Sequence, residues 1–130
     1  MIAAGDELPS FEIAAVDPEA MRVWAGLLRD PNPIHLDVAA VQAAGLGDRR
    51  INQGPANLAY ILNMLMRAFP GWRVSGIDVR FMANVFEGDH AVAGGTVTSS
   101  GADTASCDVW LDVAGRGRAL AGTADLICTN

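Results

Sequence analysis

Apolar residues follow one another with least interruption in the middle of the chain. Residues 55–66 include no charged side chain; Gly54 precedes this run, and Pro70 and Gly71 close it. Proline is favourable in the first turn of a helix, whereas proline and glycine beyond the last turn end one. We therefore predict a helix over residues 54–69. Because it is apolar on nearly all sides, we expect it to lie inside the protein core.

After this run, the pattern changes to short segments rich in β-branched and aromatic residues, separated by glycine-containing turns. They predict an antiparallel meander of four strands, over residues 72–85, 90–99, 104–113 and 118–128. Ahead of the central helix, residues 11–15 predict a further strand. Residues 18–28 predict a helix that begins after Asp17, a favoured N-cap residue. The predicted fold class is α+β, with a curled antiparallel sheet wrapped around one long central helix.

The length and charge of the chain limit what this pattern can build. With 130 residues, of which 51% are hydrophobic and 18% charged, the chain is expected to form a single domain over residues 1–130. The formal net charge of −6 argues against a nucleic-acid partner, because phosphates attract basic surfaces. All nine basic residues are arginines, whose planar forks suit anionic ligands better than the point charge of lysine.

The chain shows no signal for export or for membrane insertion. Its first residues turn acidic at Asp6 and Glu7 before any apolar stretch, so we expect a cytoplasmic protein. The central helix would be about 24 Å long, shorter than the roughly 30 Å core of a bilayer, so we expect no membrane partner. Cys107 and Cys128 lack the spacing of a redox or zinc site. We expect two packed thiols and no metal.

Candidate chemistry concentrates in residues 29–35, which read Arg-Asp-Pro-Asn-Pro-Ile-His. The two prolines fix φ and push the residues before them away from helical geometry, so a stiff, extended loop is expected. Asp30 and His35 place a carboxylate and an imidazole on this loop, which is what general acid/base chemistry requires. The structural alternative is that Asp-Pro and Asn-Pro only form turns, with His35 packed nearby.

The pattern Asp30-x-Asn32-Pro33-x-His35 resembles the hydratase motif of the MaoC-like family, the (R)-specific enoyl-CoA hydratases and dehydratases of the hotdog fold. Residues 51–54 resemble the short segment that precedes the family's central helix, and residues 79–89 resemble its strand–turn element. The order of elements fits over nearly the whole chain. The departures are Arg29 where glycine is common, Gln53 where histidine is common and Asn84 where proline is frequent.

This resemblance implies addition of water to, or its removal from, the C2=C3 bond of an acyl-CoA thioester. It makes Asp30 and His35 the catalytic pair that activates water. The backbone N–H of Gly54, at the start of the central helix, would then stabilise negative charge on the thioester oxygen. Whether Asn32 serves the site or is only a turn residue between two prolines remains open. Expected substrate-binding residues are Asn32, Gln53 and Arg80.

The resemblance implies no separate cofactor, because coenzyme A is part of the substrate, and it implies a homodimer. Two alternatives remain. Hotdog acyl-CoA thioesterases generally carry an Asp or Glu on or beside the central helix, and residues 54–69 include neither. A non-catalytic acyl-CoA-binding subunit of a heteromeric hydratase would tend to lose the Asp30/His35 pair, which this chain keeps. A hydratase is therefore favoured.

Overall fold

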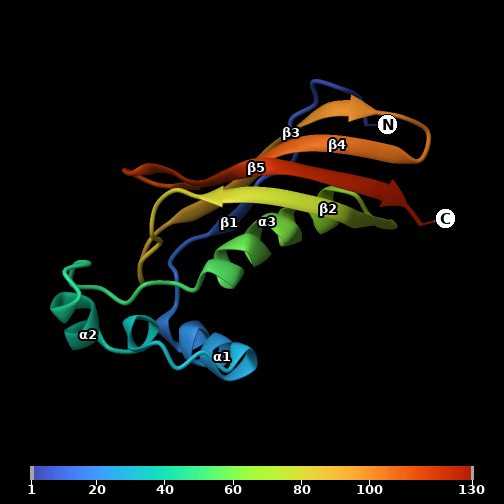
Figure 1. Cartoon of the computed structure of the whole chain (residues 1–130). Helices are drawn as coiled ribbons and strands as arrows, with labels where there is room; N and C mark the ends of the chain where they lie inside the picture. The colour runs from blue at the N-terminus through green and yellow to red at the C-terminus, as the bar shows by residue number, and fades with distance from the viewer. Residues whose placement is uncertain (1, 130) are drawn as a thin grey trace.

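A computed structural model of the chain describes residues 2–129. Its strands are β1 (Phe11–Ile13), β2 (Trp72–Phe81), β3 (Ala91–Ser100), β4 (Thr104–Val113) and β5 (Gly117–Cys128). Its helices are α1 (Pro18–Leu28), α2 (Val38–Ala43) and α3 (Gly54–Ala68), with the 3-10 turn η1 (Pro33–His35). Figure 1 shows the sheet lying over α3, while α1 and α2 lie below the sheet, beyond the N-terminal end of α3.

The sheet is antiparallel, with strand order β1-β3-β4-β5-β2. The predicted α+β class and curled sheet are confirmed, and register shifts in three strand pairs add to the twist. The predicted four-strand meander is wrong for β2, which pairs with β5 and not with β3. The connection after β2 crosses to β3, which lies between β1 and β4, and it is hydrogen-bonded to residues 50–52 on the way.

The central helix is buried on the side that faces the sheet. Ile61, Met64 and Leu65 are fully buried in the core, whereas Met66 is exposed, so α3 is enclosed less completely than its composition predicts. Gly95 of β3 allows this packing: a Cβ there would lie 3.3 Å from the Met64 Cε and 2.8 Å from the Asp108 carbonyl oxygen. No helix within residues 2–129 is both long and apolar enough to cross a membrane.

Several predicted boundaries shift once the tertiary hydrogen bonds are known. β2 ends at Phe81 because the next two N–H groups, those of Met82 and Ala83, both turn to the Ala119 carbonyl. β1 ends at Ile13, two residues earlier than expected. The short helix α2 was not predicted, although its N-cap Asp37, which accepts a hydrogen bond from Ala39 N–H at 2.9 Å, is a visible start signal.

The two cysteines are free and differ in burial. Cys107 is buried in the core, as expected, and Cys128 is half-buried. Burial raises the pKa of the Cys107 thiol to about 11, and the negative charges of Asp108 and Asp125 act in the same direction.

Helix α1 ends in a left-handed turn that sets the direction of the following loop. The predicted N-cap is confirmed, since the Asp17 carboxylate accepts a hydrogen bond from Glu19 N–H at 2.9 Å. At the other end Arg29 has φ 50° and ψ 43°, and it is the one non-glycine residue with positive φ among residues 2–129. A side chain is disfavoured in this conformation, which explains why glycine suits this position.

We predict that Arg29→Gly raises the free energy of unfolding by about 0.5–1 kcal/mol, because it relieves the left-handed strain. Urea denaturation monitored by circular dichroism measures the change. The matched control is Arg22→Gly, an exposed arginine in the helical part of α1, which should lower the free energy of unfolding by about 1 kcal/mol. A loss of stability in Arg29→Gly would contradict the prediction.

Candidate active site

The structure brings Asp30 and His35 together. Asp30 follows the left-handed end of α1, and His35 is the last residue of η1. The Asp30 Oδ2 lies 3.4 Å from the His35 Nε2. The His35 side chain is 10% exposed and the Asp30 side chain 36% exposed, so the imidazole is held inside and the carboxylate opens towards solvent.

The loop between them is not extended throughout, which corrects the sequence prediction. Residues Pro33–His35 form a 3-10 turn, because the fixed φ of a proline also suits the first position of a helix. Asn32 caps this turn by accepting the Ile34 N–H at 3.3 Å with its side chain. Its own N–H donates to the Asp30 Oδ1 at 3.1 Å. Asn32 is therefore a turn residue through its side chain and orients Asp30 through its backbone.

A backbone carbonyl fixes the tautomer of His35. The His35 Nδ1 lies 2.7 Å from the Ile51 carbonyl oxygen, and since a carbonyl can only accept, Nδ1 carries the hydrogen. Nε2, which faces Asp30, is then the position that gains or loses a proton. At 3.4 Å the Nε2–Oδ2 pair is longer than an ordinary hydrogen bond. The His35 Nε2 therefore faces the Asp30 carboxylate across a gap, on the side where the carboxylate is accessible.

The segment that supplies this carbonyl is hydrogen-bonded on both of its sides. On one side, the Ile51 N–H donates to the Ile34 carbonyl at 3.0 Å. On the other, Ile51 forms a β-bridge with Phe86, and the Asn52 N–H donates to the Val85 carbonyl at 2.7 Å. The segment is thus held in place before the chain enters α3.

Gly54 is the first residue of α3, where backbone N–H groups have no partner within the helix. The N-cap residue Gln53 makes no capping hydrogen bond with its side chain, so these amides keep their capacity to bind an oxygen atom. A Cβ on Gly54 would lie 3.3 Å from the Phe81 ring, tighter than most contacts of a real Cβ. Glycine therefore allows the Phe81 ring to pack beside the first residue of the helix.

Neither Gln53 nor Arg80 is hydrogen-bonded to Asp30 or His35 among residues 2–129. Gln53 is fully buried, and its Nε2 donates to the Met21 carbonyl of α1 at 2.8 Å. Its Oε1 is the one buried side-chain oxygen or nitrogen without a hydrogen-bond partner in the described part of the chain. Arg80 pairs with Ala121 in the sheet and lies in a groove with Thr123, whereas its neighbour Val79 packs towards the core.

A buried polar group that sequence reasoning missed lies at the start of α3. The Asn52 Nδ2 donates to the Asn57 Oδ1 at 2.7 Å and to the Tyr60 hydroxyl oxygen at 3.1 Å. The sequence does contain a signal for it, because Asn57 lies inside the apolar run of residues 55–66 and Asn52 lies just before it. An amide side chain that is buried needs a hydrogen-bond partner. Burial raises the pKa of Tyr60 above its ordinary value of 10.0, and the hydrogen bond from Asn52 opposes this.

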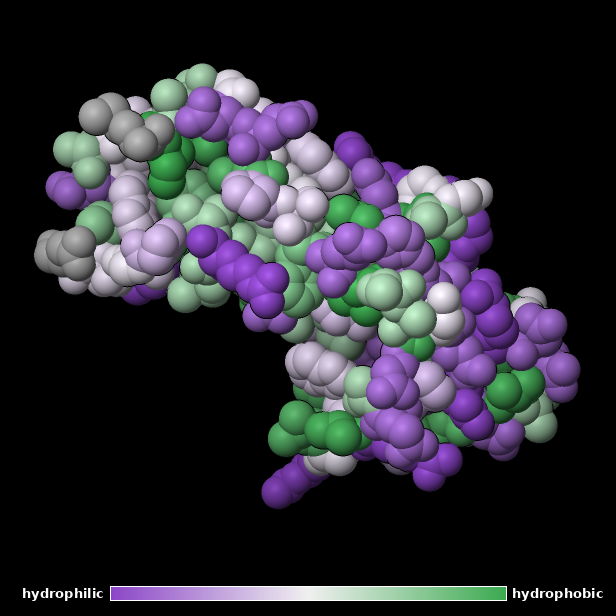
Figure 2. All heavy atoms as spheres, turned by 180° about the vertical axis from the view of Figure 1, so that it is seen from behind, coloured by the Kyte–Doolittle hydropathy of each residue, from purple (hydrophilic) through white to green (hydrophobic). Residues whose placement is uncertain are grey.

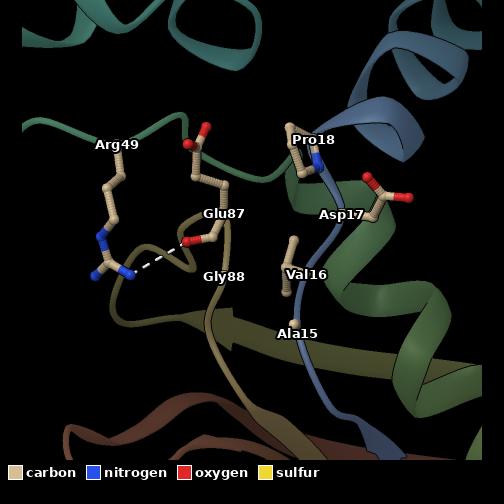
Figure 3. A pocket seen from close by; sticks show the side chains of 7 residues that line it. All are labelled: Ala15, Val16, Asp17, Pro18, Arg49, Glu87 and Gly88. Carbon is tan, nitrogen blue, oxygen red and sulfur yellow. Dashed lines mark hydrogen bonds between the residues drawn. The ribbon is translucent and has the colours of Figure 1, made fainter.

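A surface groove of about 570 Å³ lies between the turn that precedes β3 and the connection from β1 to α1. Figure 3 shows Arg49 and Glu87 on one side of it and Val16 and Asp17 on the other. The Arg49 Nη1 donates to the Glu87 carbonyl at 3.2 Å, the contact drawn as a dashed line in Figure 3. Neither Asp30 nor His35 lines this groove.

We predict that Tyr60 ionises above pH 10 in the folded protein and near pH 10 in urea, because only the folded state buries the phenol. The unfolded state then loses its proton first, so this group makes stability fall as pH rises from about 10 through the folded pKa. Tyr60 is the one tyrosine of the chain, so phenolate absorbance reports it alone, with Tyr60→Phe as the blank. A folded-state midpoint at or below 10 would contradict this.

Solved structures share this fold. An (R)-hydratase from A. caviae involved in PHA biosynthesis has a TM-score of 0.89 and 23% identity over 98% of this chain and 97% of its own. The R-hydratase PhaJ1 from Pseudomonas aeruginosa has a TM-score of 0.87 and 20% identity, over 98% of this chain and 82% of its own. A chain of the ChsH1-ChsH2 complex from Mycobacterium tuberculosis has a TM-score of 0.87 and 19% identity, over 98% of this chain and 99% of its own.

A thioesterase also appears among the neighbours. The fluoroacetyl-CoA-specific thioesterase FlK has a TM-score of 0.70 and 14% identity, over 98% of this chain and 87% of its own. No curated protein matches the sequence. The family model of the MaoC like domain matches residues 4–110. With its hotdog fold, the chain belongs to the family of MaoC-like domains.

Proposed function

We propose that this protein is an (R)-specific enoyl-CoA hydratase or dehydratase, which adds water to the C2=C3 bond of an acyl-CoA thioester or removes it. The observation that carries the proposal is the Asp30/His35 pair, in which the His35 Nε2 faces the Asp30 Oδ2 at 3.4 Å while the Ile51 carbonyl holds Nδ1. The family and the fold of the two (R)-hydratase neighbours support the same reaction class.

In the hydration direction, the pair would take one proton from water and return one to the substrate. The hydroxyl oxygen forms a bond to C3, the π electrons move towards the thioester, and C2 receives a proton from the pair. Because one proton is taken and one is given, Asp30 and His35 end each turnover in their starting state. The Ile51 carbonyl supports this cycle, since it holds the Nδ1 hydrogen and leaves Nε2 to exchange protons.

Negative charge gathers on the thioester oxygen as C3 is attacked, and the Gly54 amide is the proposed donor to it. The positive end of the α3 dipole favours an anion there. Loss of one such donor typically costs about 10²–10³ in rate. The absence of a side chain at Gly54 lets the Phe81 ring pack on one side of this residue, and the carbonyl would approach the amide from elsewhere.

Direct contacts of Asn32, Gln53 and Arg80 with the substrate stay predictions. The full burial of Gln53 favours a role in holding α1 against the start of α3. Arg80 lies in the groove with Thr123, so contact with the same substrate would require the coenzyme A portion to reach that groove. Asn32 is exposed and next to the pair, which makes it the best placed of the three.

The test is an assay of the purified chain with crotonyl-CoA, a longer enoyl-CoA and a branched or ring-bearing one. Loss of enoyl absorbance without release of thiol is the expected result. Release of free coenzyme A as thiol would instead indicate the thioesterase alternative. Absence of turnover by the isolated chain with any substrate would favour a subunit of a heteromeric hydratase.

We predict that Asp30→Asn and His35→Ala each lower the hydration rate at least about 100-fold, because each removes a proton-transfer group. The matched control is His90→Ala, since His90 is the other histidine and pairs with Glu12 at 2.6 Å on the surface. Circular dichroism should show all three variants folded. Activity within a few-fold of wild type in Asp30→Asn or His35→Ala would exclude this loop as the active site.

We also propose a homodimer. β2 lies at one edge of the sheet and pairs only with β5 among the described strands. Figure 2 shows the molecule hollowed between the sheet-and-α3 body and the lobe that holds α1. Large apolar side chains are exposed on α1 and at the end of β2, and they include Val23, Leu27, Phe81 and Met82. A second copy would cover them and bring further walls to the site.

We predict that sedimentation equilibrium gives twice the chain mass of 13.6 kDa. Leu27→Glu should weaken the association, because it places a charge where we expect an apolar contact. Ala20→Glu, at another exposed position of the same helix, serves as its control. A monomer at tens of micromolar wild-type protein would contradict the proposal.

A further inference from the structure

A buried carboxylate that the proposed mechanism does not use lies at the turn before β3. Asp89 is 7% exposed, and its Oδ2 accepts a hydrogen bond from the Phe86 N–H at 2.7 Å. The Arg49 Nη1 donates to its Oδ1 at 3.0 Å, and the Arg116 Nη2 donates to its Oδ2. Burial of a carboxylate is unfavourable unless it is paired, and here two guanidinium groups pair with it.

The same two arginines enclose an aromatic ring. The Arg49 guanidinium carbon lies 5.0 Å from the centre of the Phe86 ring, and that of Arg116 lies 4.9 Å from it. Both distances suit cation–π contacts. Arg116 also donates to the Asn84 carbonyl at 3.4 Å. Arg49, Phe86, Asp89 and Arg116, called the Asp89 cluster below, thus tie residues 84–89 to two distant parts of the chain.

The Asp89 cluster is connected to the catalytic pair by a continuous run of backbone contacts. Phe86 forms the β-bridge with Ile51, and the Glu87 N–H donates to the Arg50 carbonyl at 2.9 Å. The Ile51 carbonyl oxygen in turn lies 2.7 Å from the His35 Nδ1 and accepts its hydrogen. A shift of residues 84–89 would therefore move the acceptor that selects the tautomer of His35.

We infer that the Asp89 cluster positions the acid/base pair, acting through Phe86 and Ile51 on His35. Asp89, Arg49 and Arg116 are in this sense positioning residues. The inference rests on the proposed function for its effect on rate, while its effect on the histidine tautomer does not depend on any activity. A misplacement of a catalytic group by about 1 Å can slow a reaction about 100-fold.

The chain offers a matched control on the outer face of the sheet. Arg118 lies over the Trp110 ring at 4.6 Å and pairs with Asp112 at 2.9 Å, the same combination of contacts as at Arg116. Its partners belong to β4, and it makes no contact with residues 84–89 among the hydrogen bonds and ion pairs of residues 2–129. Arg118→Met removes equivalent interactions without touching the proposed link.

The kinetic experiment compares Arg116→Met with Arg118→Met in the enoyl-CoA hydration assay. We expect kcat to fall at least about tenfold in Arg116→Met, with KM within about twofold of wild type, because positioning and not binding is lost. Arg118→Met should stay within about twofold of wild type. Arg116→Lys, which keeps the charge but loses the planar face, should recover part of the rate.

The second measurement is the tautomer of His35 in ¹⁵N-labelled protein, read from long-range ¹H–¹⁵N correlations. The chain has two histidines, so a His90→Gln background assigns the signals. We expect neutral His35 as the Nδ1–H form in wild type and Arg118→Met, and a larger Nε2–H share in Arg116→Met. Asp89→Asn should behave like Arg116→Met, with Asp112→Asn as its control.

The inference is overturned if Arg116→Met and Asp89→Asn keep both the tautomer and the kcat of their controls. It is also overturned if they lose only thermal stability, because that would show a purely structural cluster. If the wild-type protein hydrates no substrate, the proposed function fails, but the tautomer comparison still decides the inference.

Discussion

The arrangement of the site depends on the backbone of Ile51. Its carbonyl accepts the Nδ1 hydrogen of His35, its N–H donates to the Ile34 carbonyl, and the residue faces Phe86 in a β-bridge. Three residues later Gly54 begins α3. Because one short segment contacts the histidine turn and leads directly into the helix, the imidazole and the first amides of α3 are positioned by the same piece of backbone.

Helix α3 in turn is held by the core and by buried polar contacts. Gly95 leaves room for the end of the Met64 side chain against the sheet. Gln53 joins the first turn of α3 to Met21 of α1, the helix whose C-terminal end leads into Asp30. The carboxylate and the imidazole therefore come from separate elements, α1 and η1, which are hydrogen-bonded to Gln53 and Ile51 in the segment that leads into α3.

The departures from the family motif alter the support of the acid/base pair and leave its two groups in place. Arg29 occupies a left-handed turn that glycine would adopt with less strain. Gln53 is buried against α1 and does not contact His35 among the hydrogen bonds of residues 2–129. Both departures therefore lie beside Asp30 and His35 and leave these two residues in place.

The sequence by itself determined what local physics controls: the central helix from its uncharged run, the cap at Asp17, the strand segments and the proline-rich loop with Asp30 and His35. Only the tertiary structure decided that β2 pairs with β5, that Arg116 and Asp89 meet across 27 positions, and that the Ile51 carbonyl selects the histidine tautomer. Periodicity and capping act within a few residues, whereas these contacts join distant segments whose approach depends on how the whole sheet curls around α3.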